Sequence, residues 1–228
     1  MAQSEAAVYL AESTFDAGAL IAWLVAGAEQ SATLDTASGD EDLDFLSETP
    51  DVSRPVLPLR RGDASPERNA EALDLLERGG PGRLAGLWPQ WQADPRLAGL
   101  DYPGALLALR AVLELDRPQT QSHGALAELI GRALQSGDVE LGTLAAQVAT
   151  RLGLSELQET VTQCLQRHCL ELQPQGRGLF LDALETLGDG RCVRAMEAFL
   201  AQCAGQLLDH EAWRARHIVQ VIRRGGRR

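Results

Sequence analysis

Apolar residues recur at helical spacing along most of the chain. Near the N-terminus, Leu20, Ile21, Leu24 and Val25 form an i, i+1, i+4, i+5 face, which predicts a helix within residues 4–30. From Asp101 onward the pattern is regular, and short polar or glycine-containing turns interrupt it. It predicts helices at about 102–115, 122–136, 138–152, 154–170, 176–188, 190–207 and 209–224.

A composition break separates the two helical parts. Residues 31–65 show little periodicity, and Pro50, Pro55 and Pro58 exclude a continuous helix there. Helices resume at Ser65, an expected N-cap that is followed by a proline. We therefore divide the chain into an N-terminal helical segment, an acidic, proline-containing linker or loop, and a helical repeat domain, at residues 1–30, 31–65 and 66–228.

Composition supports an all-α fold. Hydrophobic residues make up 45% of the chain but aromatic residues only 4%, so leucine and alanine, both strong helix formers, carry the apolar content. Short connections between these helices predict antiparallel helix pairs. The longest apolar stretch, residues 17–28, is shorter than the ~20 residues of a membrane span, and no basic residue precedes Arg54 as in a secretory signal. We therefore expect a cytoplasmic protein without a membrane segment.

The C-terminal part contains a weak internal repeat. Shifting the sequence by 35 residues places leucine on leucine and glycine on glycine at the pairs Leu144/Leu179, Leu152/Leu187, Gly153/Gly188 and Leu165/Leu200. A helix pair that cannot bury its apolar face alone gains a core when such pairs stack.

The stretch from Ala183 to Cys192, together with the apolar helix after it, resembles the inter-helix turn of bacterial HEAT-like repeat proteins. The resemblance covers about residues 101–226. It implies a short α-solenoid in which Gly188 ends one helix and Asp189 caps the next, while Ser155 replaces the missing aspartate at the preceding turn. Proteins of this family are usually adaptors or regulatory subunits, and a minority are enzymes such as alkylpurine DNA glycosylases or chromophore lyases.

Charge is unevenly distributed along the chain. The formal net charge is −11, and all 21 basic residues are arginine, which excludes lysine-based Schiff-base and phosphate-loop chemistry. Residues 31–53 contain acids and no basic residue. Within them lies an acidic–apolar segment typical of docking sequences, with the candidate partner-binding residues Asp40, Glu41, Asp42, Leu43, Asp44, Phe45 and Leu46.

The C-terminus is basic, and its arginines are the second set of candidate partner-binding residues. In the helix at 209–224, Ala215, Ile218, Val219 and Ile222 form the packing stripe, so Arg216 and Arg223 are expected to point outward. Three roles remain open for them: interaction with the helix dipole, binding of an acidic partner or the chain's own acidic segment, and binding of nucleic acid. The residues concerned are Arg216, Arg223 and Arg224.

Two further groups have alternative roles. Trp88 and Trp91, beside Pro89, either pack the N-terminal part onto the first repeat or expose an aromatic anchor for a partner. Cys164 and His168 share a helix face at metal-compatible spacing, but the apolar stripes around the cysteines favour core packing. No cofactor, metal or catalytic residue is therefore predicted.

The favoured function is a non-enzymatic adaptor or regulatory subunit that binds another protein. Nucleic-acid binding through the arginine-rich C-terminus is the first alternative, and the net charge of −11 disfavours it. An enzyme or metal site built on the Cys/His cluster is the second.

Overall fold

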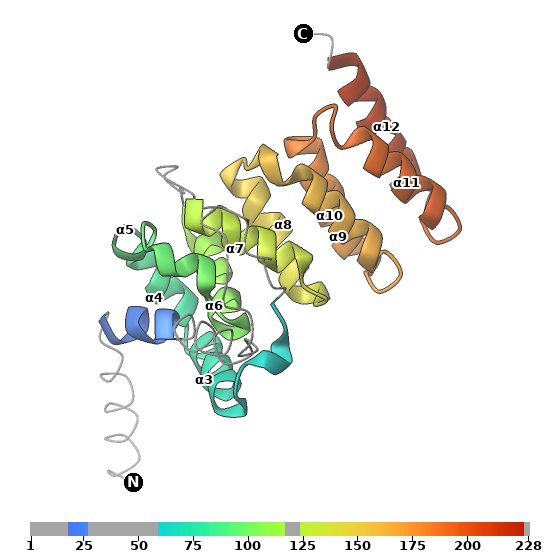
Figure 1. The fold of residues 1–228 in the computed structure, drawn as a ribbon. Helices are drawn as coiled ribbons and strands as arrows, with labels where there is room; N and C mark the ends of the chain where they lie inside the picture. The colour runs from blue at the N-terminus through green and yellow to red at the C-terminus, as the bar shows by residue number, and fades with distance from the viewer. Residues whose placement is uncertain (1–17, 27–58, 117–123, 226–228) are drawn as a thin grey trace, which may run out of the picture.

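A computed structural model describes residues 18–26, 59–116 and 124–225, and within these ranges it contains helices and turns without a strand (Figure 1). This confirms the all-α class. Residues 18–26 are helical. The longer helices that follow are α3 (Pro66–Glu77), α6 (Tyr102–Glu114), α7 (Gly124–Gln135), α8 (Val139–Leu152), α9 (Gln158–His168), α10 (Pro174–Leu187), α11 (Val193–Cys203) and α12 (Asp209–Gly225). Shorter elements are η1 (Arg61–Asp63), α4 (Gly80–Gly86), α5 (Trp88–Trp91), η2 (Pro95–Gly99) and η3 (Ser155–Leu157).

From α6 onward the helices alternate between two layers. Helices α6, α8, α10 and α12 contact one another in succession, and α7, α9 and α11 do the same. Each layer also contacts the other, as in the pairs α7 with α8, α9 with α10 and α11 with α12. Figure 1 shows these helices following one another along the molecule, with α12 at the end opposite α3. One face of α12 therefore has no following helix against it in the described part of the chain.

Side-chain caps fix several helix starts. Ser65 accepts a hydrogen bond from the Arg68 amide at 3.2 Å, which confirms it as the N-cap of α3. Asp138 accepts from the Leu141 amide at 2.8 Å and caps α8 in the same way. These bonds satisfy amides that have no partner inside the helix.

Two turn predictions were wrong in detail. Asp189 accepts from the Arg191 amide at 2.8 Å and closes a turn, whereas α11 begins only at Val193 without a side-chain cap. Likewise, Ser155 lies inside η3 and caps no helix. The extra turns between the helices displace both residues from the N-cap position.

Two glycines end helices for different physical reasons. Gly153 ends α8 at φ 68°, a left-handed conformation that favours glycine. Gly188 ends α10 at φ −65°, so its conformation is ordinary. A Cβ at position 188 would instead clash first with the Leu184 carbonyl oxygen of α10, and it would lie 2.8 Å from Ile222 Cδ1 of α12. Gly188 is therefore needed because a side chain at this position would meet the backbone of α10.

A glycine-to-alanine substitution should change the free energy of unfolding in opposite directions at two positions. Gly153→Ala should lower the free energy of unfolding by about 1 kcal/mol, because alanine is strained at positive φ. Gly178→Ala should raise it by about 0.5–1 kcal/mol, because Gly178 lies inside α10 and a Cβ there meets no atom within 4 Å. Urea denaturation of the two variants measures both values. Unchanged stability in Gly153→Ala would contradict this account of the α8 terminus, and a loss of stability in Gly178→Ala would contradict the prediction for α10.

A single apolar core joins the N-terminal segment to the helical domain. Leu20 and Leu24 of the first helix, both almost fully buried, belong to the same cluster as residues of α6 through α12. Leu59 is also buried there, and η1 lies next to it. The predicted linker 31–65 therefore does not extend to residue 65 as unstructured chain, while its residues 31–58 lie outside the described part.

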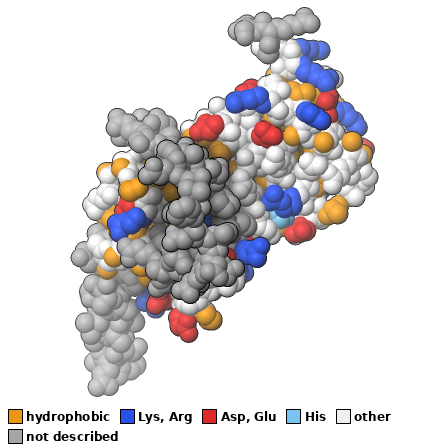
Figure 2. All heavy atoms as spheres, viewed as in Figure 1, with side chains coloured by type: hydrophobic (Ala, Val, Ile, Leu, Met, Phe, Trp, Pro, Cys, Tyr) orange, Lys and Arg blue, Asp and Glu red, His pale blue; other side chains and the backbone are white. Residues whose placement is uncertain are grey.

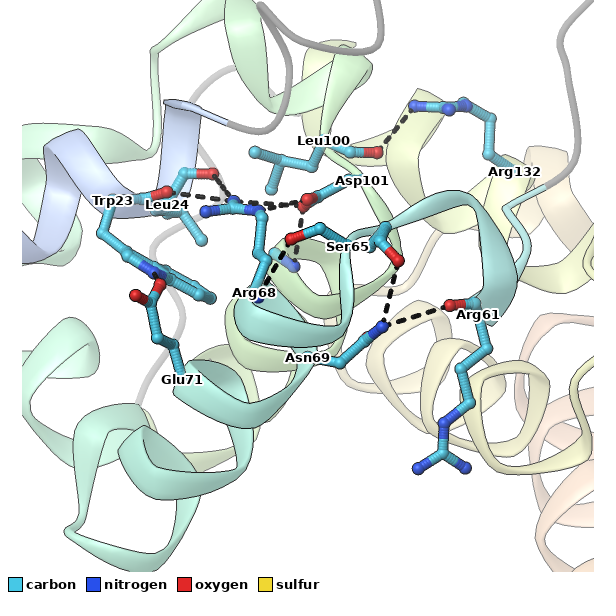
Figure 3. Close-up of polar contacts among 12 residues, drawn as sticks. Trp23, Leu24, Arg61, Ser65, Arg68, Asn69, Glu71, Leu100, Asp101 and Arg132 are labelled. Carbon is cyan, nitrogen blue, oxygen red and sulfur yellow. Dashed lines mark hydrogen bonds and ion pairs between the residues drawn. The ribbon is translucent and has the colours of Figure 1, made fainter.

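Among the described residues, one buried ion pair lies near each end of the row of helices and joins two elements there. Near the N-terminus, the Arg68 guanidinium pairs with Asp101 and donates to the Trp23 carbonyl at 3.0 Å, as Figure 3 shows. Near the C-terminus, Arg177 pairs in a bidentate manner with Glu211, with Nε–Oε1 at 3.0 Å and Nη2–Oε2 at 3.2 Å. Each pair joins helices that are distant in sequence.

A further arginine contact repeats along the array. Arg132 donates to the Leu100 carbonyl at 3.1 Å, and Arg167 donates to the Gln135 carbonyl at 3.1 Å. Both the donor and the acceptor of the second contact lie 35 residues after those of the first. The same polar contact thus recurs at the spacing of the sequence repeat.

In the described residues, every helix is too short or too polar to cross a membrane.

Candidate functional site

Helix α12 is held with one face against the array. Ala215, Ile218 and Val219 are buried, and α12 contacts both α10 and α11. In its first turn, Glu211 accepts from the Leu208 amide at 2.8 Å while it pairs with Arg177. These contacts fix which residues of α12 face the core.

The opposite face of α12 is exposed and carries two large apolar side chains. Trp213 is 64% exposed and Val221 is 52% exposed. The Trp213 and His217 rings stack with their centroids 5.2 Å apart and their planes inclined by 5°. Trp213, His217 and Val221 follow one another at four-residue spacing, so they share one stripe of the helix.

The arginines of α12 fall into two classes. Arg214 bridges Asp182 and Glu185 of α10 at 2.5 Å each, and the Glu185 carboxylate raises the pKa of Arg214 most. Arg223 pairs with Glu197 of α11. By contrast, Arg216 and Arg224 are exposed, and neither forms an ion pair in the described part of the chain. Figure 2 shows basic side chains gathered over the end of the molecule that contains α12.

These residues define the candidate site. We call Trp213, Arg216, His217, Val221 and Arg224 the outer face of α12. It combines an exposed aromatic–apolar stripe with two guanidinium groups whose charge is not balanced by a described carboxylate. Such a surface can bind an apolar segment that carries acidic side chains.

The three arginines predicted near the C-terminus have different surroundings in the structure. Arg216 lies on the outer face of α12, as the packing stripe predicted, and Arg224 lies there as well. Arg223 is also exposed, but it is engaged with Glu197. The acidic candidates of the N-terminal part, Asp40, Glu41, Asp42, Leu43, Asp44, Phe45 and Leu46, lie outside the described residues.

Trp88 and Trp91 are not surface anchors, and this alternative was wrong. Trp88 is 5% exposed and Trp91 is fully buried. Their rings meet edge to face with centroids 4.7 Å apart, and Trp91 Nε1 donates to the Leu84 carbonyl at 2.7 Å. Both rings belong to the core that covers the start of the helical domain.

The outer-face residues that sequence reasoning missed are Trp213, His217 and Val221. One signal was present in the sequence. The stripe Ala215, Ile218, Val219 and Ile222 already accounts for the buried face of this helix, and Trp213 lies outside it. From the sequence alone, Trp213 is therefore a candidate for an exposed apolar residue.

The Cys/His cluster fits core packing. Cys164, Cys169, Cys192 and Cys203 are buried free thiols, and no group of His, Cys, Asp and Glu suited to a metal ion occurs among the described residues. Burial raises the pKa of Cys164 to about 12, and burial followed by the Cys203 thiol raises that of Cys169 to about 12. Thiols of this kind are poor nucleophiles near neutral pH.

These thiols should be protected from modification in the folded protein. At pH 8 the native chain should react very slowly with a thiol reagent such as 5,5′-dithiobis(2-nitrobenzoate), because all the thiols are buried and burial raises the pKa of Cys164 and of Cys169 to about 12. In denaturant, all 4 cysteines should react rapidly. Fast labelling of one cysteine in the native chain would contradict the packing role.

Comparison of the chain with protein-family models, with curated proteins and with solved structures gives no significant match.

Proposed function

We propose that this chain is a non-enzymatic protein–protein interaction module that binds a partner protein through the outer face of α12. The observation that carries the proposal is Trp213, a large aromatic side chain left 64% exposed on the last described helix. Exposed apolar surface in water is unfavourable, and tryptophan is among the residues most enriched in binding hot spots. Its stacking on His217 preorganises the ring for contact.

The charges of the outer face favour an acidic partner segment. Arg216 and Arg224 present guanidinium groups without described carboxylate partners, and such groups pair well with aspartate and glutamate. A second copy of the same helix would bring like charges together. We therefore expect a partner segment with an apolar side chain over Trp213 and acidic side chains toward Arg216 and Arg224.

We further propose that residues 101–226 form a short HEAT-like α-solenoid. Three observations support this: the alternation of helices between two layers, the repeated arginine–carbonyl contact, and its spacing of 35 residues. In the described part of the chain, α12 is the last helix, and one of its faces has no helix against it. The binding surface is therefore expected on that face of α12.

The other functions have less support. Nucleic-acid binding would use several free arginines, but Arg214 and Arg223 are already engaged by carboxylates and the net charge is −11. Enzymatic use of the cysteines is disfavoured by their burial. Reduced, buried cysteines also fit the cytoplasmic location that we propose.

The test compares two variants of exposed apolar residues. The tagged chain is purified from its native cells, and co-purifying proteins are quantified for the original sequence, Trp213→Ala and Leu73→Ala. Leu73 is 50% exposed on α3, so it is a matched control distant from α12. We expect Trp213→Ala to reduce the dominant partner at least tenfold and Leu73→Ala to leave it unchanged. Equal retention by both variants would overturn the proposal.

A further inference from the structure

A cleft lined by arginines lies away from α12, between η1, the turn that joins α7 to α8, and α9. Its volume is about 460 Å³. Arg60, Arg61 and Arg167 line it together with Asp138. We call it the arginine cleft. Its basic residues come from two regions that are about a hundred residues apart in the sequence, so the fold itself brings them together.

The walls of the arginine cleft are held in place. Leu59, beside η1, is 3% exposed, and the Asn69 side chain donates to the carbonyls of Arg61 and Ala64 at 3.4 and 3.3 Å (Figure 3). On the opposite wall, Arg167 Nη1 donates to the Gln135 and Ser136 carbonyls at 3.1 and 3.3 Å. The Arg167 guanidinium is thereby positioned, and its other N–H groups remain available as donors.

The positive charges in the cleft are not balanced. Arg60 and Arg61 are exposed, and their guanidinium groups form no ion pair with a described residue. In Figure 3 the Arg61 side chain points away from the polar network around Asn69. The single carboxylate of the lining, Asp138, already accepts from the Leu141 amide as the cap of α8. In a chain with a net charge of −11, three arginines that share a cleft with a single carboxylate indicate a site for an anion.

The charge and the volume of the cleft fit a phosphate monoester. Three guanidinium groups and one carboxylate leave a formal excess of two positive charges at the cleft. A phosphate monoester carries about −1.5 to −2 at neutral pH, and its oxygens match the planar fork of arginine, whereas one carboxylate would neutralise only half of the excess. The volume exceeds that of a phosphate group alone and falls within the roughly 300–1,000 Å³ of small-molecule sites.

We propose that the arginine cleft binds a small molecule through a phosphate monoester group, with Arg60, Arg61 and Arg167 as its ligands. This site does not depend on protein binding by α12. The purified full chain is titrated calorimetrically with inorganic phosphate, glucose 6-phosphate and adenosine 5′-monophosphate. Glucose, adenosine, sulfate and acetate are the matched ligands that lack the phosphate monoester.

Two substitutions that remove the same charge locate the binding site. Arg61→Gln changes the cleft, and Arg83→Gln changes an exposed arginine of α4 outside it. We expect at least one phosphate monoester to bind more tightly than sulfate and acetate. Arg61→Gln should weaken the affinity for this monoester at least tenfold, whereas Arg83→Gln should change the affinity less than twofold. Binding of no phosphate compound, equal binding of sulfate or acetate, or equal weakening by both variants would overturn the proposal.

A third variant tests the chain's own acidic residues as the occupant. It replaces Asp40, Asp42 and Asp44 with asparagine and Glu41 with glutamine. If phosphate compounds bind only to this variant, an internal carboxylate occupies the cleft, and the proposal is overturned. The same affinity with and without these acids supports it.

Discussion

Glu211→Ala is expected to lower the free energy of unfolding by about 3–5 kcal/mol, because it leaves a buried charge without its partner. Glu211 is 3% exposed and holds Arg177 at 3.0 and 3.2 Å. The substitution also removes the acceptor of the Leu208 amide, which begins the turn into α12. Urea denaturation followed by circular dichroism measures the change.

Two companion variants separate the buried charge from other effects. Glu197→Ala removes a carboxylate that is 46% exposed and pairs with Arg223, so it should cost less than about 1 kcal/mol. The double variant Arg177→Met/Glu211→Leu replaces the pair with apolar side chains and should recover most of the lost stability. A double variant as unstable as Glu211→Ala would show that the ion pair itself, and not the unpaired charge, determines the effect.

Arg68→Ala is expected to have a similarly large effect, about 3–5 kcal/mol, at the other end of the array. It leaves the Asp101 carboxylate, 9% exposed, without its cation. It also removes the contact of the guanidinium with the Trp23 ring, 4.2 Å from the ring centroid, and the bond to the Trp23 carbonyl. Arg68 links residues 18–26 to α6. The amides of residues 18–26 should therefore lose protection from hydrogen exchange when the global stability falls.

Hydrogen–deuterium exchange tests this local consequence. Amides of residues 20–26 should exchange faster in Arg68→Ala than in the original sequence at the same denaturant concentration. Arg78→Ala, at the residue that follows α3, is the control. The side chains of Arg78 and its partner Asp74 are 55% and 46% exposed, so this ion pair should contribute little to stability. Unchanged exchange in both variants would mean that Arg68 does not hold the N-terminal helix.

The sequence predicted helices well where several signals agreed. For α8, the apolar periodicity and the glycine-containing turns on either side predict residues 138–152, and the helix spans Val139–Leu152. The structure adds the Asp138 cap and the left-handed Gly153 as the physical reasons for these ends. The run from Gly79 to Gly82 was less clear. It was expected to end a helix, but α4 begins at Gly80 because the following proline suits the start of a helix. Composition therefore located the boundary but could not distinguish an end from a new beginning.

The site was harder to predict because exposure depends on neighbours. A tryptophan beside a proline and a tryptophan within a basic helix are equally plausible surface residues when each is considered from the sequence alone. Trp91 is buried where it contacts Leu84 of α4 and Trp88, whereas α12 has no following helix against Trp213 in the described part of the chain. Whether an arginine is paired also depends on its neighbours. Arg214 lies beside two carboxylates of α10, whereas Arg216 has no carboxylate partner among the described residues.

Site-specific photo-crosslinking tests the central claim, that the outer face of α12 binds a protein. The photoreactive residue p-benzoylphenylalanine replaces Val221, or Leu73 as the control, in the full chain expressed in its native cells; both positions are about half exposed. The account predicts one dominant adduct with a different protein from position 221, reduced by Trp213→Ala, and no such adduct from position 73. The same adduct from both positions, or only crosslinks between copies of this chain, would contradict it.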